Sequence, residues 1–290
     1  MNMWRNLKPY LLVLPAISVI GLLFFGGFLL GFLESIGLYS LVGEREISFQ
    51  PYVDLLQNAD FRRSILYTLR ITALSTLLSA FVGLALGLSF IQMKGIGRRI
   101  LQFPMLIPHL AVAYLVALLL MQSGWISRLL FAFGWIDEIQ DFPILVHESF
   151  GWGIISAYVW KESPFIAFML VPVLLRIQDQ WGQVARILGA GRWAYFREIV
   201  LPLLMPSWLA ASFIVFAFKF SAFEIPLLLG VTYPQMISVF AYQLFSGDIV
   251  NERPLALALN ILIAFITALL GLLAYRLSKS WLGEESRGWN

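Results

Sequence analysis

Two short stretches place ionisable side chains inside otherwise apolar sequence. The first is Lys161-Glu162-Ser163-Pro164, and the second runs from Lys219 to Glu224. An ionisable group at membrane depth is costly unless it is paired or hydrated, and for that reason it often marks a transport pathway. Adjacent residues point about 100° apart on a helix, so Lys161 and Glu162 cannot both face lipid without a partner. We expect at least one of them to face protein or water.

Two interpretations stay open for six of these residues: Lys161, Glu162, Ser163, Pro164, Lys219 and Glu224. In the first, they line a permeation path, and Pro164 kinks its helix because proline removes a hydrogen bond. In the second, they form structural ion pairs, Lys161 with Glu224 or Glu162 with Lys219. Glu224 is the leading candidate for contact with a cationic solute or a partner chain. The alternative is that it snorkels to water at the outer surface.

Other chemistry finds little support in the chain. There is no cysteine, and the only histidines are His109 and His147, so neither a disulfide framework nor a histidine-based metal cluster is expected. We expect His109, at a helix start, to be hydrogen-bonded locally. No G-x-x-x-x-G-K-[ST], H-E-x-x-H or G-x-S-x-G pattern occurs, which argues against a nucleotide site or a membrane-embedded enzyme. We therefore assign no catalytic residue and no metal ligand, and a net charge of +3 leaves no footprint for nucleic acid.

Composition and hydropathy place the chain in a membrane. Of its 290 residues 60% are hydrophobic and 13% are charged, whereas soluble domains are about a quarter charged. A helix needs about 20 apolar residues to cross the hydrocarbon core. Six segments qualify: 10–32, 70–94, 101–122, 151–175, 202–219 and 253–276, the fourth interrupted at Lys161-Glu162-Ser163-Pro164. Segment 225–247 is long enough as well, but its prolines favour a re-entrant or surface-lying segment.

The basic residues orient these six spans. One side would carry twelve of them: Arg5, Lys8, Lys94, Arg98, Arg99, Arg176, Arg186, Arg192, Arg197, Arg276, Lys279 and Arg287. The other side would carry five: Arg45, Arg62, Arg63, Arg128 and Arg253. Because short cytoplasmic loops are enriched in Lys and Arg, both termini are predicted to be cytoplasmic. A seventh span would move the C-terminal basic residues outside, so this bias favours six.

The longest loop on the basic side, residues 176–201, reads as two short amphipathic helices. Val184, Ile187 and Leu188 share the apolar face of the first, and Trp193, Phe196 and Val200 share that of the second. Gly189 and Gly191 between them allow a sharp change of direction. Two interpretations fit the residues equally well. The helices lie in the lipid headgroups, or they form a docking site for a cytoplasmic partner.

This loop resembles the EAA loop of permeases from binding-protein-dependent ABC importers. Gln183-Val184-Ala185 stands at the EAA triplet, Gly189-Ala190 matches the Gly-Ala pair, and Arg192, Trp193, Phe196 and Leu201-Pro202 fall at matching offsets. Gln183 replaces the usual Glu, and Leu188 replaces a common Asp, which weakens any charged contact. The resemblance extends from about Phe61 to Lys279. The segment around Lys219 to Gly230 looks more like polyamine, iron or thiamine importers than sugar importers.

The resemblance implies an all-α polytopic membrane protein with six transmembrane helices, a five-helix permease core and one N-terminal helix. Residues 1–60 would hold the N-terminal tail, first helix and outer loop, residues 61–280 the core, and residues 281–290 a cytoplasmic tail. The 183–200 helices would dock on an ATPase, with Gln183, Val184, Ala185, Gly189, Ala190, Arg192, Trp193, Phe196 and Pro202 as the coupling residues.

The same resemblance implies the partners. These would be two ATP-binding subunits, a second permease chain of the same or similar kind, an external solute-binding protein and the bilayer of a bacterial or archaeal inner membrane. ATP and magnesium would be bound by the ATPase, and this chain would need no cofactor. The alternative function is an ion- or proton-coupled secondary transporter that uses the intramembrane Lys and Glu residues.

Overall fold

The computed structural model describes residues 3–39, 47–93, 95–248 and 252–287, and within these ranges it contains helices and no strand. Six segments of this described part are long and apolar enough to cross a membrane: Leu12–Ser35, Ala59–Phe90, His109–Ala132, Trp152–Ile187, Arg192–Ser221 and Glu252–Leu273. The predicted all-α class and the number of six spans are therefore confirmed.

The contacts divide the chain into two compact units. The first comprises residues 1–62 and 240–265, with helices α1 (Met3–Ser35), α2 (Gln50–Gln57) and the first turns of α12 (Glu252–Arg287). Arg253 Nε of α12 lies 2.6 Å from Glu34 Oε1 of α1, and Ser35 Oγ lies 2.8 Å from Tyr52 Oη of α2. Polar contacts thus tie the ends of these three helices together.

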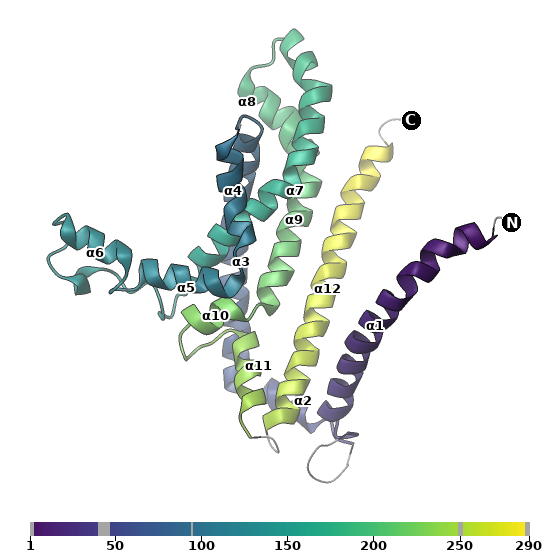
Figure 1. The fold of residues 1–290 in the computed structure, drawn as a ribbon, viewed down its shortest axis with the longest axis vertical. Helices are drawn as coiled ribbons and strands as arrows, with labels where there is room; N and C mark the ends of the chain where they lie inside the picture. Colours follow the sequence, from purple (N-terminus) through teal and green to yellow (C-terminus); the bar gives the residue numbers. More distant parts are fainter. Residues whose placement is uncertain (1–2, 40–46, 94, 249–251, 288–290) are drawn as a thin grey trace. The chain divides into compact units, whose positions relative to one another are not determined.

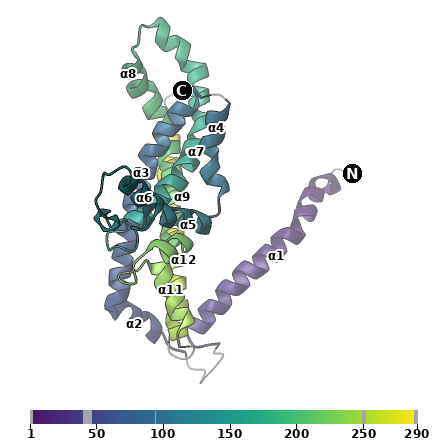
Figure 2. The same ribbon diagram turned by 60° about the vertical axis from the view of Figure 1, so that its left-hand side comes forward.

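The second unit comprises residues 63–239 and 266–290. It contains most of α3 (Ala59–Phe90), then α4 (Ile96–Leu106), α5 (His109–Leu120), α6 (Trp125–Ala132), α7 (Trp152–Ile187), α8 (Arg192–Tyr195), α9 (Leu201–Ser221) and α10 (Glu224–Leu229). A 3₁₀ turn (Ile139–Asp141) precedes α7, and a π-helical turn (Phe196–Val200) joins α8 to α9. Helix α7 packs against α9, α4 and α5, and α7 and α9 lie side by side in Figures 1 and 2.

Two glycines of α3 lie against α7, and at Gly83 the two helices are unusually close. A Cβ placed on Gly83 would lie 2.7 Å from Ile166 Cβ and 2.9 Å from the Ser163 carbonyl oxygen, and one on Gly87 would lie 3.5 Å from the Ala167 carbonyl oxygen. Gly83 and Gly87 are four residues apart, so they share one face of α3. Small residues at this spacing let helix backbones approach in a membrane, where van der Waals packing drives association.

Helix α7 differs from the prediction because it is continuous. It runs for 36 residues through both Pro164 and Pro172, with no interruption at Lys161-Glu162-Ser163-Pro164. Pro164 and Ser163 are buried, and Ser163 Oγ donates to the Val159 carbonyl one turn earlier (2.5 Å). Ser163 and Ile166, on either side of Pro164, lie against Gly83 of α3, so the helix is packed at the point where proline removes a hydrogen bond, as expected for proline in a membrane helix.

The third predicted span is broken instead. Helix α4 ends at Leu106 and α5 begins at His109, so residues 107–108 separate them, and we call this pair the helix break. Pro108 cannot donate the hydrogen bond that a continuing helix needs. In Figure 1, α5 and α6 extend sideways from α3, α7 and α9. The apolar segment of spanning length is therefore 109–132, not the predicted 101–122.

Segment 225–247 does not form one long helix. It contains α10 and α11 (Ile237–Ser246), with a non-helical stretch between them. The 10 residues of α11 cover about 15 Å, which is half of the roughly 30 Å hydrocarbon core. The structure thus agrees with the exclusion of a seventh span, and the location of this segment in the bilayer stays a prediction.

Candidate functional site

Lys161 binds the backbone at the helix break. Its ammonium donates to the carbonyl oxygens of Pro104 (2.8 Å), Met105 (3.0 Å) and Ile107 (2.7 Å). The Pro104 carbonyl would normally accept from the amide of residue 108, which is a proline and has none. The last carbonyls of a helix also carry partial negative charge, which a cation stabilises. Lys161 is 6% exposed, and its ammonium is held by backbone carbonyls. The hypothesised ion pair between Lys161 and Glu224 is therefore not formed.

Glu162 contacts the helix that begins on the other side of the same break. Its Oε1 lies 3.0 Å from His109 Nε2, and His109 is the first residue of α5. A carboxylate near a helix N-terminus is favoured by the helix dipole, as a cation is near a C-terminus. Adjacent residues of α7 therefore place opposite charges at the two helix ends that meet at residues 107–108. The expected local hydrogen bond of His109 is wrong, because its partner lies 53 residues away.

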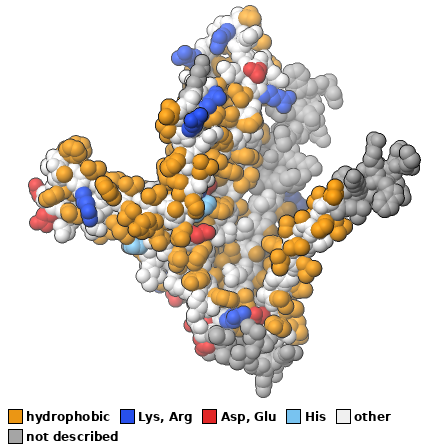
Figure 3. Space-filling view, viewed as in Figure 1, with side chains coloured by type: hydrophobic (Ala, Val, Ile, Leu, Met, Phe, Trp, Pro, Cys, Tyr) orange, Lys and Arg blue, Asp and Glu red, His pale blue; other side chains and the backbone are white. Residues whose placement is uncertain are grey.

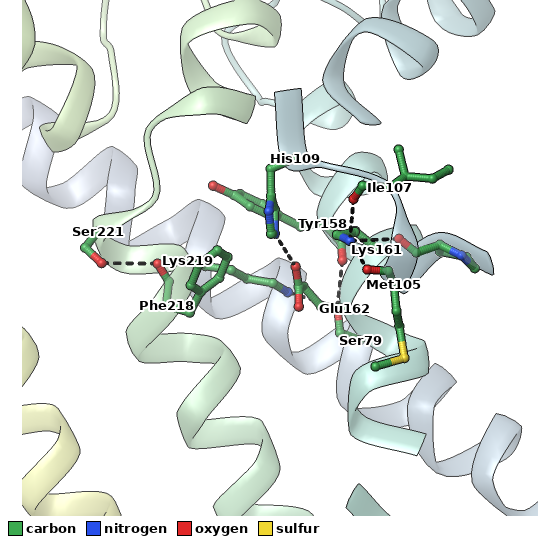
Figure 4. A network of polar contacts seen from close by, with 11 residues as sticks. Ser79, Met105, Ile107, His109, Tyr158, Lys161, Glu162, Phe218, Lys219 and Ser221 are labelled. Carbon is green, nitrogen blue, oxygen red and sulfur yellow. Dashed lines mark hydrogen bonds and ion pairs between the residues drawn. The ribbon is translucent and has the colours of Figure 1, made fainter. Parts of the chain in front are cut away.

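Lys219 is fully buried near the end of α9. Its ammonium donates to Ser79 Oγ of α3 (2.9 Å) and lies 5.4 Å from the centre of the Tyr158 ring. A cation over an aromatic face is attracted by the ring quadrupole, more strongly when it is desolvated. The hypothesised ion pair between Glu162 and Lys219 is not formed, since Glu162 pairs with His109. Figure 4 shows these side chains converging from α3, α7 and α9.

The remaining predicted path residues fall into two groups. Ser163 and Pro164 are buried, and the Ser163 carbonyl lies at the close approach to Gly83 of α3. Glu224 is exposed at the first residue of α10, outside the buried network. Of the six predicted residues, the structure thus brings Lys161, Glu162 and Lys219 into one layer of charged groups and leaves Glu224 at the surface.

The predicted glycine elbow is present, although the two flanking helices are not separate. The first is the C-terminal end of α7, and the second comprises α8, the π turn and the start of α9, where Pro202 lies in the first turn. We call residues 188–191 the elbow. The Gly189 amide donates to the Arg186 carbonyl (3.1 Å) and the Ala190 amide to the Ala185 carbonyl (2.9 Å). This pair of bonds is a Schellman motif, and it places Gly189 at φ +74°.

Apolar side chains around the elbow are exposed. Ile187 is 85% exposed, Leu188 79% and Trp193 70%, and Val184 is exposed as well. We call these four side chains the knob. The ring of Phe196 lies 5.8 Å from that of Trp193 and supports it, whereas Ala185 is buried. Gln183, Ala190 and Arg192 are exposed beside the knob. Figure 3 shows Lys and Arg side chains gathered at this end of the second unit.

Sequence reasoning missed three parts of this site. The carbonyl oxygens that hold Lys161 belong to the backbone, so the residue types do not reveal them. Pro108 follows Pro104 by four residues, however, and this spacing indicates that the Pro104 carbonyl has no helical partner. The contact of Gly83 and Gly87 with α7 was detectable, because G-x-x-x-G within an apolar segment is a helix-packing signal. Ser79, which accepts from Lys219, has no comparable signal.

Six apolar spans, a layer of buried charge and an exposed apolar elbow are the features of a polytopic membrane protein. Residues 79–282 match the family described as "Binding-protein-dependent transport system inner membrane component", and the chain belongs to this family. It is a permease component of a binding-protein-dependent ABC importer, a transport subunit and not an enzyme.

Individual relatives are more distant. The diacetylchitobiose uptake permease DasB of Streptomyces coelicolor is 26% identical over 287 residues, which cover 93% of this chain and 86% of that protein. The molybdenum transport permease ModB of Escherichia coli K12 is 25% identical over 160 residues, covering 53% of this chain and 66% of that protein. These two names refer to a sugar and to molybdenum, and not to polyamines, iron or thiamine.

A solved structure shares the fold. A chain of a bacterial alginate ABC transporter, crystallised with an alginate-bound periplasmic protein, superposes with a TM-score of 0.77. The superposition covers 97% of this chain and 98% of that chain at 23% identity. At this identity the likeness shows the fold alone.

Proposed function

We propose that this permease forms one half of a solute path in an inner membrane of bacterial or archaeal type and is driven by a separate ATPase. Two ATP-binding subunits, a second permease of the same or similar sequence and an external solute-binding protein would complete the importer. ATP and magnesium would be held by the ATPase. Residues 61–280 would form the permease core, after an N-terminal part (1–60) and before a short tail (281–290).

The exposed knob is the observation that carries this proposal. Ile187, Leu188 and Trp193 are each more than two-thirds exposed, on a turn whose shape is held by the Schellman motif. A rigid apolar protrusion is a liability in water and gains free energy when a partner buries it. We propose that Gln183, Val184, Ala185, Gly189, Ala190, Arg192, Trp193, Phe196 and Pro202 form or support the ATPase contact.

The charged layer would shape the solute path from within the permease. His109 has a side chain 28% exposed, so the His109–Glu162 pair lies at the edge of the packed helices, and Glu224 is exposed. We propose that these groups face the path. Lys161, Ser163, Pro164 and Lys219 are buried, and we propose that they hold the helices that form its wall.

Reconstitution tests the proposal against the secondary-transporter alternative. The permease is co-expressed with the binding-protein and ATPase genes that neighbour its own, purified and placed in liposomes. We expect solute uptake only with ATP and the ATPase, and none with an ion gradient alone. Uptake by the permease alone, dissipated by an ionophore, would establish the secondary transporter instead.

Labelling tests the proposed orientation. The chain has no native cysteine, so single-cysteine variants are clean probes. Cysteines near Gly95 and Gly191 should react only from the cytoplasm, and those near Gly134 and Gly247 only from outside. Labelling of Ser280→Cys from outside would contradict six spans with cytoplasmic ends.

A further inference from the structure

A cavity lies on the inner side of the elbow. It has a volume of about 410 Å³ and is bounded by the ends of α3 and α7, the elbow, α8 and the π turn. Its lining includes the apolar side chains of Leu88 and Ile177 and the polar side chains of Gln92, Arg186 and Arg192. A cavity with both basic and apolar lining matches a ligand that has an anionic and an apolar part.

The charge in this cavity is unbalanced. No acidic residue lines it, and the guanidinium groups of Arg186 and Arg192 have no hydrogen-bond or ion-pair partner within the part of the chain that the structure describes. Arg197, in the same loop, differs, since its Nε lies 3.6 Å from the carboxylate of Glu198. Two unpaired guanidinium groups at one cavity favour an anion, and phosphate oxygens suit their fork geometry.

The depth of the cavity favours a lipid over a free anion. The apolar helix α3 ends at Phe90, and the residues that line the cavity include Leu88, Ile91 and Gln92 at this end. We therefore place the cavity near the membrane surface, where basic pockets between membrane helices bind anionic headgroups. A free phosphate would leave the apolar lining in contact with water, whereas glycerol and the first acyl carbons would cover it.

We propose that this cavity binds the headgroup of an anionic phospholipid. Arg186 and Arg192 hold its phosphate, and the first acyl carbons rest on Leu88 and Ile177. Ala190 and Arg192 belong both to the cavity and to the surroundings of the knob, so a bound lipid fixes the elbow from its inner side. The binding itself does not rest on the proposed ATPase contact, and it is measured separately from transport.

The test measures lipid retained by the purified protein. Full-length permease is placed in nanodiscs of phosphatidylcholine with or without phosphatidylglycerol. The protein is then released from the nanodiscs, and native mass spectrometry measures which lipids stay bound to it. Wild-type protein should retain phosphatidylglycerol in preference to phosphatidylcholine. Arg186→Gln should lower that retention by roughly tenfold, because it removes a charge-assisted contact. Arg197→Gln, the matched control outside the cavity, should retain the lipid as the wild type does.

A second variant fills the cavity without removing charge. A Cβ on Gly182 would meet no atom closer than 3.8 Å, and Gly182 lines the cavity, so Gly182→Leu should fold and expel the lipid. This variant decides the question if Arg186→Gln fails to accumulate. Equal retention of both lipids by the wild type, or unchanged retention in Gly182→Leu, would overturn the proposal.

Two further measurements test whether the cavity holds something other than a lipid. Displacement of phosphatidylglycerol by millimolar inorganic phosphate would show a free-anion site and would overturn the lipid assignment. Loss of the lipid on addition of the ATPase would show that a side chain of that partner occupies the cavity, which also overturns it. Retention in both measurements supports the lipid.

Discussion

The first half of α7 and its C-terminal end differ in how their side chains match their surroundings. In the first half, Lys161 and Glu162 are ionisable and buried, and each has its partner within the chain. At the end, Ile187 and Leu188 are apolar and exposed, and no described part of the chain covers them. Buried polar groups with hydrogen-bond partners in the same chain indicate a structural role. Exposed apolar groups that nothing covers indicate a contact with a partner protein. The difference separates residues that hold the permease together from residues that connect it to another subunit.

The largest effect is expected at Lys161. Lys161→Met would leave three carbonyl oxygens without their hydrogen-bond donor, and each buried polar group left unsatisfied costs about 1–3 kcal/mol. The variant should accumulate poorly in the membrane and melt at a lower temperature in detergent. Arg176→Met, an exposed change on the same helix, is the control. Comparison with the Lys161→Leu/Glu162→Gln double variant tests the alternative: normal accumulation and melting with loss of transport would show that the pair contacts solute.

Gly189→Val should separate assembly from folding. The φ of +74° at Gly189 is unfavourable for a β-branched residue, by at least about 1–2 kcal/mol. We expect normal insertion but loss of both ATPase co-purification and transport. Gly191→Val is the matched control, since Gly191 has an ordinary φ of −68° and no atom within 4 Å of a Cβ. Full ATPase binding by Gly189→Val would show that the elbow only anchors the chain in the interface.

The His109–Glu162 contact is measured by a double-mutant cycle. His109→Gln and Glu162→Gln should each lower the free energy of unfolding, and the double variant should lose less than the sum. A contact at 3.0 Å in a partly buried site predicts a coupling energy of about 1–2 kcal/mol, within the range for interacting pairs. Thermal or denaturant unfolding in detergent supplies the four values, and strict additivity would refute the coupling.

Trp193→Ala should weaken the partner contact without affecting the fold. Trp193 is 70% exposed, so its removal leaves no cavity in the permease. Aromatic residues at the centre of an interface often contribute about 2 kcal/mol or more, which corresponds to roughly a thirtyfold change in affinity. Titration of the ATPase against purified variants measures this change. A lower melting temperature of the isolated permease would show that Trp193 packs within the chain.

The smallest effects are expected for the charges around the elbow. Arg197 and Glu198 are 69% and 71% exposed, and such pairs contribute about 0–1 kcal/mol. Arg197→Ala should therefore leave assembly and transport nearly unchanged, and Arg192→Ala should weaken ATPase binding less than Trp193→Ala does. Gln183→Glu should be tolerated, because it moves toward the pattern of the EAA loop. A tenfold loss of ATPase affinity in Gln183→Glu would contradict this.

Local patterns predicted much of the fold. Apolar runs gave six spans, and the prolines of 225–247 correctly argued against a seventh. The elbow was predictable because Gly189 is the residue type that a Schellman motif requires. The prediction was wrong at two places that contain proline. Residues 101–122 were expected to form one span but break at 107–108, whereas the span expected to be interrupted at 161–164 is continuous. Pro164 is buried where Gly83 brings α3 against α7, and this packing supports the helix, whereas residues 107–108 separate α4 from α5.

By itself, the sequence determined the class of the protein, the number of its spans and the bend at Gly189, because hydropathy and glycine conformation depend on neighbouring residues. Only the tertiary structure decided which partners the buried charges have. Glu162 bonds a residue 53 positions away, and Lys219 one 140 positions away. The choice among carbonyls, a histidine and a hydroxyl depends on how each helix is rotated about its axis. That rotation is set by packing between helices, such as the close approach at Gly83 and Gly87, and not by the charge of the residues themselves.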